Sequence, residues 1–225
     1  MQRILINTLA ATALAATAIS SADANAAEEE DLGWTGKAAL GYLSASGNAD
    51  NLNVNGALDL GYKTTNWVHT LGLTAIGAEA DGVSSAERYT AAFKSQRDFS
   101  EFNYLFGRLG YQKDRFAGVA EQFSQTVGVG RRFINTDVHV LNAEFGLGFR
   151  QQTFADTVDA NGVVVPGEED SSAIARIGAD YRWNFSETAR FDQTLAIEAG
   201  SENTNTISVS SVTAKLFESM NLVVS

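Results

Sequence analysis

Calcium binding is the chemistry that residue types and spacing suggest most directly, in the loop TVDANGVVVPGE that starts at Thr157. Most of a calcium-loop pattern is present when that threonine is position 1: Asp159 at 3, Asn161 at 5, Gly162 at 6 and Glu168 at 12. The first position of such a loop is normally an acid, and here it is not. The Asn-Gly pair is also a strong signal for a two-residue hairpin turn between β-prone residues. We expect a hairpin, with Asp159, Asn161 and Glu168 as a weak metal candidate.

The residue types that catalysis commonly requires are scarce. The chain has no cysteine, so disulfides and thiol chemistry are excluded. Its two histidines are separated, His69 lying two residues after Trp67 and His139 two residues before Leu141, in phase with apolar side chains. Neither is placed to share a pocket with a serine and an acid, and a zinc site is not expected. The sequence therefore predicts no catalytic residue, no cofactor and no enzyme activity.

The elements that would position such residues are β-strands. In the stretch LNVNGALDLGY, every second residue from Leu52 to Tyr62 is apolar or glycine, and the intervening positions are mostly polar. Period-two alternation over eleven residues is typical of a strand with one apolar and one polar face. No segment shows sustained helical periodicity. Similar segments are expected at 34–43, 52–62, 67–78, 86–98, 103–115, 122–133, 139–151, 172–184, 190–200 and 207–217, with a further start at Leu222.

Strand length indicates what the apolar face contacts. These strands exceed the usual five or six residues of soluble sheets and match the ~9–11 needed to cross a bilayer at a tilt. We therefore expect an all-β, antiparallel transmembrane β-barrel of the outer membrane. The same alternation occurs in secreted β-sandwiches and lipocalin-like barrels, which stay open as the alternative. The polar faces carry charges that suit a wet or internally paired lumen: Lys37, Asp59, Arg88, Lys94, Glu144, Arg150, Arg176, Asp180, Arg182, Asp192 and Glu198.

Short and longer connections alternate along the chain. KTTN, SEF, INTD, SETA and ESMN follow the even-numbered strands, and mostly longer segments follow the odd ones, among them SASGNADN, EADGVSSA and Thr153 to Ser171. Short periplasmic turns and longer outer loops are the plan of an outer-membrane barrel. All three tryptophans, Trp34, Trp67 and Trp183, then fall at the rim with the short turns, as an interfacial aromatic girdle requires.

The N-terminus predicts export. Arg3 precedes an alanine-rich apolar run, and Ala24 to Ala26 supplies small residues at a cleavage site, so residues 1–26 are expected to be a signal peptide. A membrane helix is the alternative, for which the run is short and interrupted by polar residues. Residues 27–32 are then an acidic leader and 33–225 the barrel. The formal net charge of −11 argues against nucleic acid as a partner. The expected partners are outer-membrane lipid and the assembly machinery of the outer membrane.

The strand count predicts a barrel that lacks its C-terminal strands. Bacterial single-chain barrels have an even number of strands and close the first strand on the last. Ten strands and a stub at Leu222–Val224 point to about twelve strands in the complete form. In the residues present, the strand at 34–43 should lack a full second partner, and the stub should pair with the tenth strand.

The strand sequences also resemble a known family. GWTGKAALGYLSASGNADNLNVNGALDLGY, followed by WVHTLGL, is similar to the opening of salt-induced outer-membrane proteins, a YdiY-like domain of unknown function. The shared features are an initial Gly-Trp, a loop at Ser46-Gly47-Asn48 and Trp67 after the next turn, and GVGRRFINTD and NAEFGLGFR resemble the middle strands. The resemblance covers most of 33–225. It implies a bacterial outer-membrane barrel with no assigned activity and no catalytic residues to transfer. The C-terminus departs from the family, whose members usually continue to a final strand ending in an aromatic residue.

The function predicted from these features is that of a non-enzymatic outer-membrane barrel with a structural or envelope-stress role. A narrow passive channel or small-ligand-binding barrel is the alternative, because charges of interleaved sign can either plug a lumen or line it. An outer-membrane lipid-modifying enzyme is a further alternative, which the placement of the two histidines disfavours.

Overall fold

The computed structural model describes residues 32–45, 50–159, 162–201, 203–217 and 220–224. Every regular secondary-structure element in these ranges is a β-strand. The expected signal peptide and all but the last residue of the expected leader lie outside the described residues. The strands are β1 (Gly33–Ala45), β2 (Asn51–Lys63), β3 (Trp67–Ala80), β4 (Val83–Asp98), β5 (Asn103–Asp114), β6 (Val119–Asn135), β7 (His139–Phe154), β8 (Thr157–Val158), β9 (Val164–Val165), β10 (Glu169–Ser186), β11 (Ala189–Gly200), β12 (Thr204–Phe217) and β13 (Met220–Val224).

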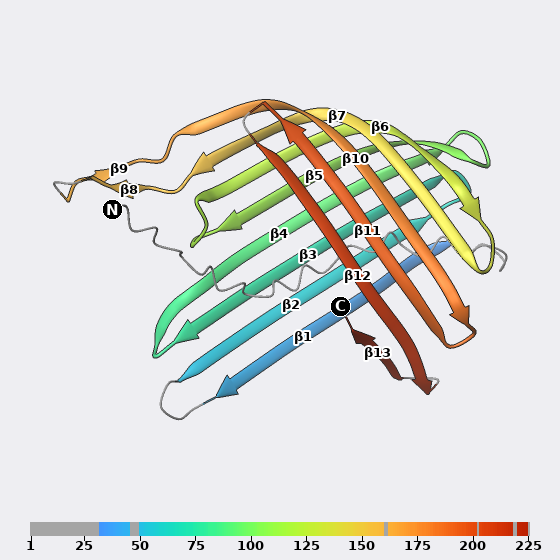
Figure 1. Ribbon diagram of the computed structural model, residues 1–225, viewed down its shortest axis with the longest axis horizontal. Helices are drawn as coiled ribbons and strands as arrows, with labels where there is room; N and C mark the ends of the chain where they lie inside the picture. The colour runs from blue at the N-terminus through green and yellow to red at the C-terminus, as the bar shows by residue number, and fades with distance from the viewer. Residues whose placement is uncertain (1–31, 46–49, 160–161, 202, 218–219, 225) are drawn as a thin grey trace, which may run out of the picture.

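Eleven strands form a single antiparallel sheet in the order β1-β2-β3-β4-β5-β6-β7-β10-β11-β12-β13. The other two, β8 and β9, pair only with each other, in a hairpin that projects beyond the ends of β7 and β10 (Figure 1). The sheet curls across its width, so that β11 and β12 cross in front of β1 and β2 in this view (Figure 1). The architecture is therefore a half-barrel, which confirms the expected all-β antiparallel fold.

The two rims of the half-barrel carry different connections. We call one the turn rim, where residues 64–66, 99–102, 136–138 and 187–188 join consecutive strands, and the opposite one the loop rim. The long segment between β7 and β10 contains the β8–β9 hairpin and lies at the loop rim (Figure 1). All three tryptophans lie at the strand ends that meet the turn rim, as the sequence predicts.

The expectation of a long loop between β3 and β4 is wrong. The strands extend to Ala80 and from Val83, so EADGVSSA contributes only a two-residue turn. Asp81 and Gly82 have φ angles of 51° and 76°, both in the left-handed region that a type I′ hairpin turn requires. The Asp81 carboxylate accepts a hydrogen bond from the Asp50 N–H at 2.9 Å, which ties this turn to the start of β2. The Asp-Gly pair is the hairpin signal that explains the tight connection.

The expected strands are otherwise confirmed, with boundaries that differ by a few residues. β4 begins at Val83 rather than at residue 86, and β10 begins at Glu169 rather than at residue 172. Among the described residues, β1 pairs only with β2. β13 pairs with β12, with Val224 opposite Val212 and the residues before Val224 continuing the ladder. The sequence predicted both pairings at the sheet edges.

Gly82→Ala should destabilise the folded protein by about 1–2 kcal/mol, because a side chain disfavours the left-handed conformation. Gly118→Ala is the matched control, since both glycines have open space where a β-carbon would lie but only Gly82 has a positive φ. Urea unfolding of the protein folded in detergent micelles measures both variants. Equal losses at the two positions would contradict a conformational requirement at Gly82.

Candidate functional site on the inner face

The concave, inner face of the half-barrel is defined by side-chain contacts that skip strands. Lys94 in β4 forms an ion pair with Glu144 in β7, across β5 and β6. Asp98 in β4 pairs with Arg132 in β6, across β5, with 2.9 Å between nitrogen and oxygen. Side chains converge over intervening strands only on the concave side of a curled sheet. Because successive side chains alternate between faces, these residues fix which positions of each strand point inward.

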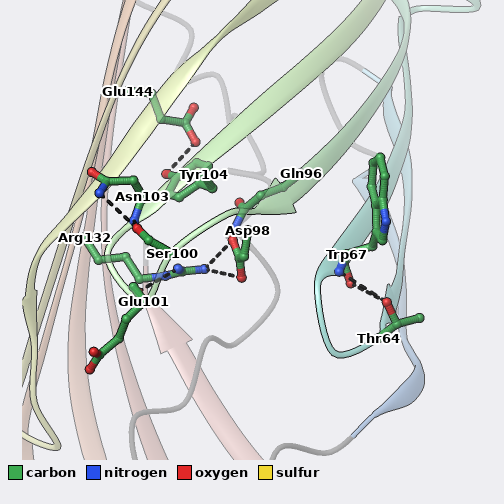
Figure 2. A network of polar contacts seen from close by, with 10 residues as sticks. All are labelled: Thr64, Trp67, Gln96, Asp98, Ser100, Glu101, Asn103, Tyr104, Arg132 and Glu144. Atoms are coloured by element: carbon green, nitrogen blue, oxygen red, sulfur yellow. Dashed lines mark hydrogen bonds and ion pairs between the residues drawn. The ribbon is translucent and has the colours of Figure 1, made fainter.

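A cluster around Glu144 occupies the inner wall of β4–β7. The Tyr104 hydroxyl donates a hydrogen bond to Glu144 Oε1 at 2.9 Å, as Figure 2 shows. Lys94 Nζ, besides its ion pair, lies 5.7 Å from the centre of the Tyr104 ring and 5.4 Å from that of Phe106. Glu144 is only 8% exposed. A carboxylate so buried depends on these partners, because a desolvated charge is costly unless it is paired and hydrogen-bonded.

A second cluster lies between the Glu144 cluster and the turn rim (Figure 2). Arg132 Nη2 donates to both carboxylate oxygens of Asp98, each at 2.9 Å, and Nη1 donates to the Glu101 carbonyl at 3.1 Å. Gln96 Nε2 donates to Asp98 Oδ1 at 3.0 Å. The Arg132 guanidinium also lies 5.2 Å from the centre of the Tyr104 ring, so the two clusters share that tyrosine.

The rest of the inner wall continues this pairing of opposite charges. All the charged residues that the sequence placed in the lumen occupy inward positions of their strands. Asp180 accepts a hydrogen bond from the Thr194 hydroxyl at 2.8 Å. The further inner ion pairs are Arg88–Asp114, Arg176–Glu198 at 2.7 Å and Arg182–Asp192 at 2.8 Å. Charges of interleaved sign therefore neutralise much of this surface locally.

Two inward aromatic residues, Tyr104 and Phe106, are absent from the sequence-predicted set. They are 3% and 4% exposed, and their rings lie over glycines of the adjacent strands. A β-carbon at Gly130 would overlap the Tyr104 ring, and one at Gly128 would lie 2.8 Å from Phe106 Cε1. The signal that could have found them is the run of inward glycines in VGVGRRF and FGLGFR, facing two aromatic residues on the otherwise polar side of β5.

The outer face has the opposite character. Phe145, Leu147 and Phe149 in β7 are 50%, 58% and 61% exposed, while inward Glu144 and Arg150 are buried. The described strands β1–β7 and β10–β12 carry charged outward side chains only near the rims. Arg97 and Arg131 lie near the turn rim, and Glu79, Glu87, Lys113, Glu121 and Glu169 lie near the loop rim. The half-barrel is thus apolar outside and charged inside, the reverse of a soluble sheet with a protein core.

Aromatic side chains ring the outer face at the turn rim and include both histidines. The His69 ring stacks against Trp67, Tyr62 and Phe93, with ring centres 5.6, 6.4 and 6.2 Å away. His139 stacks on Trp183 at 6.1 Å and forms a 2.9 Å hydrogen bond through Nδ1 with the Tyr181 hydroxyl. The histidines therefore belong to two aromatic clusters on different strands.

The loop that resembles a calcium site forms the β8–β9 hairpin. The Asp159 carboxylate accepts a hydrogen bond from the Val163 N–H at 2.8 Å, and the Gly162 N–H donates to the Asp159 carbonyl at 3.0 Å. Glu168 is exposed at the base of the hairpin, and Asn161 lies outside the described residues. In the described part of the chain, no three His, Asp or Glu side chains are grouped to hold a metal ion. Asp159 serves here as a turn acceptor, which the hairpin interpretation predicts.

A curled antiparallel sheet with a charged inner wall and an apolar outer surface places the protein in the barrel-like class of all-β folds. A family model described as "Protein of unknown function, DUF481" matches residues 38–225, and the chain belongs to this family. It is similar to "Uncharacterized protein YdiY" of Escherichia coli (strain K12), with 27% identity over 193 residues, covering 85% of this chain and 71% of the relative. The YdiY-like resemblance read from the strand motifs is confirmed. Within the described residues, no helix has the length and apolar character to span a membrane.

Glu144→Gln should destabilise the protein by about 3–5 kcal/mol, because it leaves the Lys94 ammonium without its carboxylate on a buried wall. Lys113→Gln, which breaks the exposed pair with Glu121, should cost about 1 kcal/mol or less. Urea unfolding in detergent micelles compares the two. If Glu144→Gln proves no more costly than Lys113→Gln, the inner wall is hydrated enough to screen its charges.

Proposed function

We propose that this chain is a bacterial outer-membrane β-barrel protein that inserts its outer face into lipid and encloses a polar lumen. Its role in the envelope is structural rather than enzymatic. One observation carries the proposal: across the described strands, outward charges occur only near the two rims, with an uncharged band between them. Outer-membrane lipid and the outer-membrane assembly machinery are the partners that such a protein requires.

The height of the uncharged band fits a bilayer. On β6, the outward charges nearest each rim are Glu121 and Arg131, and on β4 they are Glu87 and Arg97. In both strands the charges are ten residues apart. At ~3.4 Å per residue and a strand tilt of ~45°, this separation spans roughly 24 Å along the membrane normal. The apolar band of outer-membrane barrels is about 25 Å tall.

The aromatic ring at the turn rim supports the same placement. Tryptophan, tyrosine and histidine combine an apolar body with a polar edge, which suits the boundary between acyl chains and headgroups. Trp34 and Tyr62 lie 4.8 Å apart between ring centres, and Arg97 lies 5.5 Å from the Trp67 ring. Both histidines stack on aromatic side chains within this ring, and such an interfacial role supports the non-enzymatic proposal.

A narrow passive channel or small-ligand-binding barrel is the second candidate. The observation in its favour is that the inner wall offers charged and hydrogen-bonding groups along its whole height, rather than an apolar filling. Planar-bilayer conductance of the folded protein separates a channel from a plugged barrel, because a barrel plugged by its own ion pairs conducts no current.

Outward Phe145→Arg or Ile177→Arg should cost about 2–4 kcal/mol in the membrane and reduce assembly, because each places a charge at mid-band in lipid. Inward Asn142→Arg, on the same β7 strand as Phe145, is the matched control and should be tolerated better. The measurement is the heat-modifiable band that the outer-membrane fraction gives on a gel. Equal tolerance on the two faces, or absence of the wild-type band from that fraction, would refute the proposal.

The β8–β9 hairpin should face the cell exterior, because it extends from the loop rim (Figure 1). An epitope inserted at Gly162 should be accessible to antibody on intact cells, since this residue lies exposed at the hairpin tip with a φ of 81°. A matched insertion in the turn rim, at residue 187, should become accessible only after the outer membrane is permeabilised. The reverse pattern would invert the topology.

A further inference from the structure

Two outward arginines at the turn rim have no carboxylate partner in the described part of the chain. Arg97 in β4 and Arg131 in β6 are both exposed, and they point outward because their chain neighbours Asp98 and Arg132 point inward. Arg131 Nη1 donates a long hydrogen bond, 3.4 Å, to the Asn103 side-chain oxygen, which is a neutral acceptor. Neither guanidinium charge is therefore balanced by a protein carboxylate among these residues.

The outward cations at the opposite rim differ in this respect. Lys113 lies 2.6 Å from a carboxylate oxygen of Glu121, and Arg115 lies 3.2 Å from one of Glu87. These cations are themselves exposed, so exposure alone does not explain why the turn rim supplies no counter-ion. The protein thus compensates its outward cations at the loop rim and leaves them uncompensated at the turn rim.

Aromatic rings hold both turn-rim arginines against the outer face. The Arg97 guanidinium lies 5.5 Å from the centre of the Trp67 ring, and that of Arg131 lies 5.8 Å from the centre of the Phe133 ring. A guanidinium stacked on a ring uses its planar face for that contact, and its N–H edge can still donate to other groups. Because Trp67 belongs to the aromatic ring of the turn rim, Arg97 is held at the level where acyl chains meet headgroups.

The surface between the two arginines is apolar and carries no outward acid. Leu105 in β5 and its register partner Val129 in β6 are 51% and 50% exposed. The acids at this end of the described strands β3–β7 and β10–β11, Glu101, Asp137 and Glu187, belong to the turns beyond the strand ends. The turn-rim outer face therefore combines an apolar surface for acyl chains with cations at headgroup level.

We propose that the surface around Arg97 and Arg131 binds phospholipids of net negative charge in the leaflet that meets the turn rim. This inference rests on the proposed function and names the class of lipid that the barrel contacts there. The N–H groups of a guanidinium fit the oxygens of a phosphate. Every phospholipid has a phosphate, but a choline headgroup neutralises it internally, whereas an anionic lipid also balances the arginine charge.

The test measures which lipid lies beside Arg97, with Trp67 as the reporter. The full chain, with Trp34 and Trp183 replaced by phenylalanine, is reconstituted into phosphatidylcholine vesicles that contain a minor fraction of phosphatidylglycerol. In one sample the phosphatidylglycerol carries bromine on its acyl chains, and in the other an equal fraction of the phosphatidylcholine does. Bromine quenches tryptophan fluorescence on contact. Brominated phosphatidylglycerol should quench Trp67 more strongly, with an association constant about fivefold higher for one arginine at the surface.

The decisive variant combines Arg97→Gln with Arg131→Gln, after which the two lipids should quench Trp67 equally. Lys113→Gln combined with Arg115→Gln is the matched control. It removes the same charge from the loop rim, where both cations have carboxylate partners, and should leave the preference unchanged. Quenching by brominated phosphatidylcholine shows that each variant has inserted.

Equal quenching by the two lipids before the arginines are changed would overturn the headgroup assignment and leave the membrane placement intact. A preference that survives the loss of both arginines would do the same. Should that variant fail to insert, salt decides, because screening should reduce the preference and an unchanged preference at high salt contradicts a charge-based one. If neither lipid quenches Trp67, the outer face does not contact lipid, and the proposed function falls together with this inference.

Discussion

Charge compensation on the inner wall is the constraint on which this half-barrel depends. In the described residues no second sheet or helix covers the concave face of this curled layer, so that face is stabilised through its own side chains. The pairs Lys94–Glu144 and Asp98–Arg132 do this across intervening strands, and they therefore bind β4 to β6 and β7 as well as neutralising charge. Hydrogen bonds between neighbouring strands determine the pairing, and these longer contacts favour the curvature.

Glycine placement allows those contacts to form. The Tyr104 and Phe106 rings lie against the wall because Gly128, Gly130 and Gly146 present no side chains beneath them. Aromatic cover of inward glycines is a known means of stabilising curved sheets, in which glycine permits the bend and the ring restores the lost packing. Tyr104 then brings its hydroxyl to Glu144 while its ring contacts the Arg132 guanidinium, so one residue joins the apolar and polar parts of the wall.

The sequence predicts the positions of the strands, the inward or outward direction of their side chains, and the family. All three follow from period-two alternation and local motifs. The outward Phe145 and inward Glu144 of β7 could be assigned from parity alone. The partners of Glu144 could not, since Lys94 lies fifty residues away and reaches it only through register and curvature. The Asp81-Gly82 pair is a hairpin signal in the sequence, but the polar residues around it make the segment resemble a longer loop. Inward Arg108 was also missed, because the surrounding strand reads as aromatic rather than charged.

The outward charged side chains give the two rims different chemical character. The difference depends on which residues each charge contacts and not on the net charge of the protein. At the turn rim, Arg97 lies over Trp67 and Arg131 over Phe133, at 5.5 and 5.8 Å from the ring centres. Cation–π contact holds each guanidinium close to an amphipathic ring, a combination suited to anionic headgroups. At the loop rim, the carboxylates of Glu79, Glu87 and Glu121 predominate, and they favour water because a carboxylate is costly to desolvate. Under the proposed function, this asymmetry gives the protein one rim that anchors in the interface and one that projects from it.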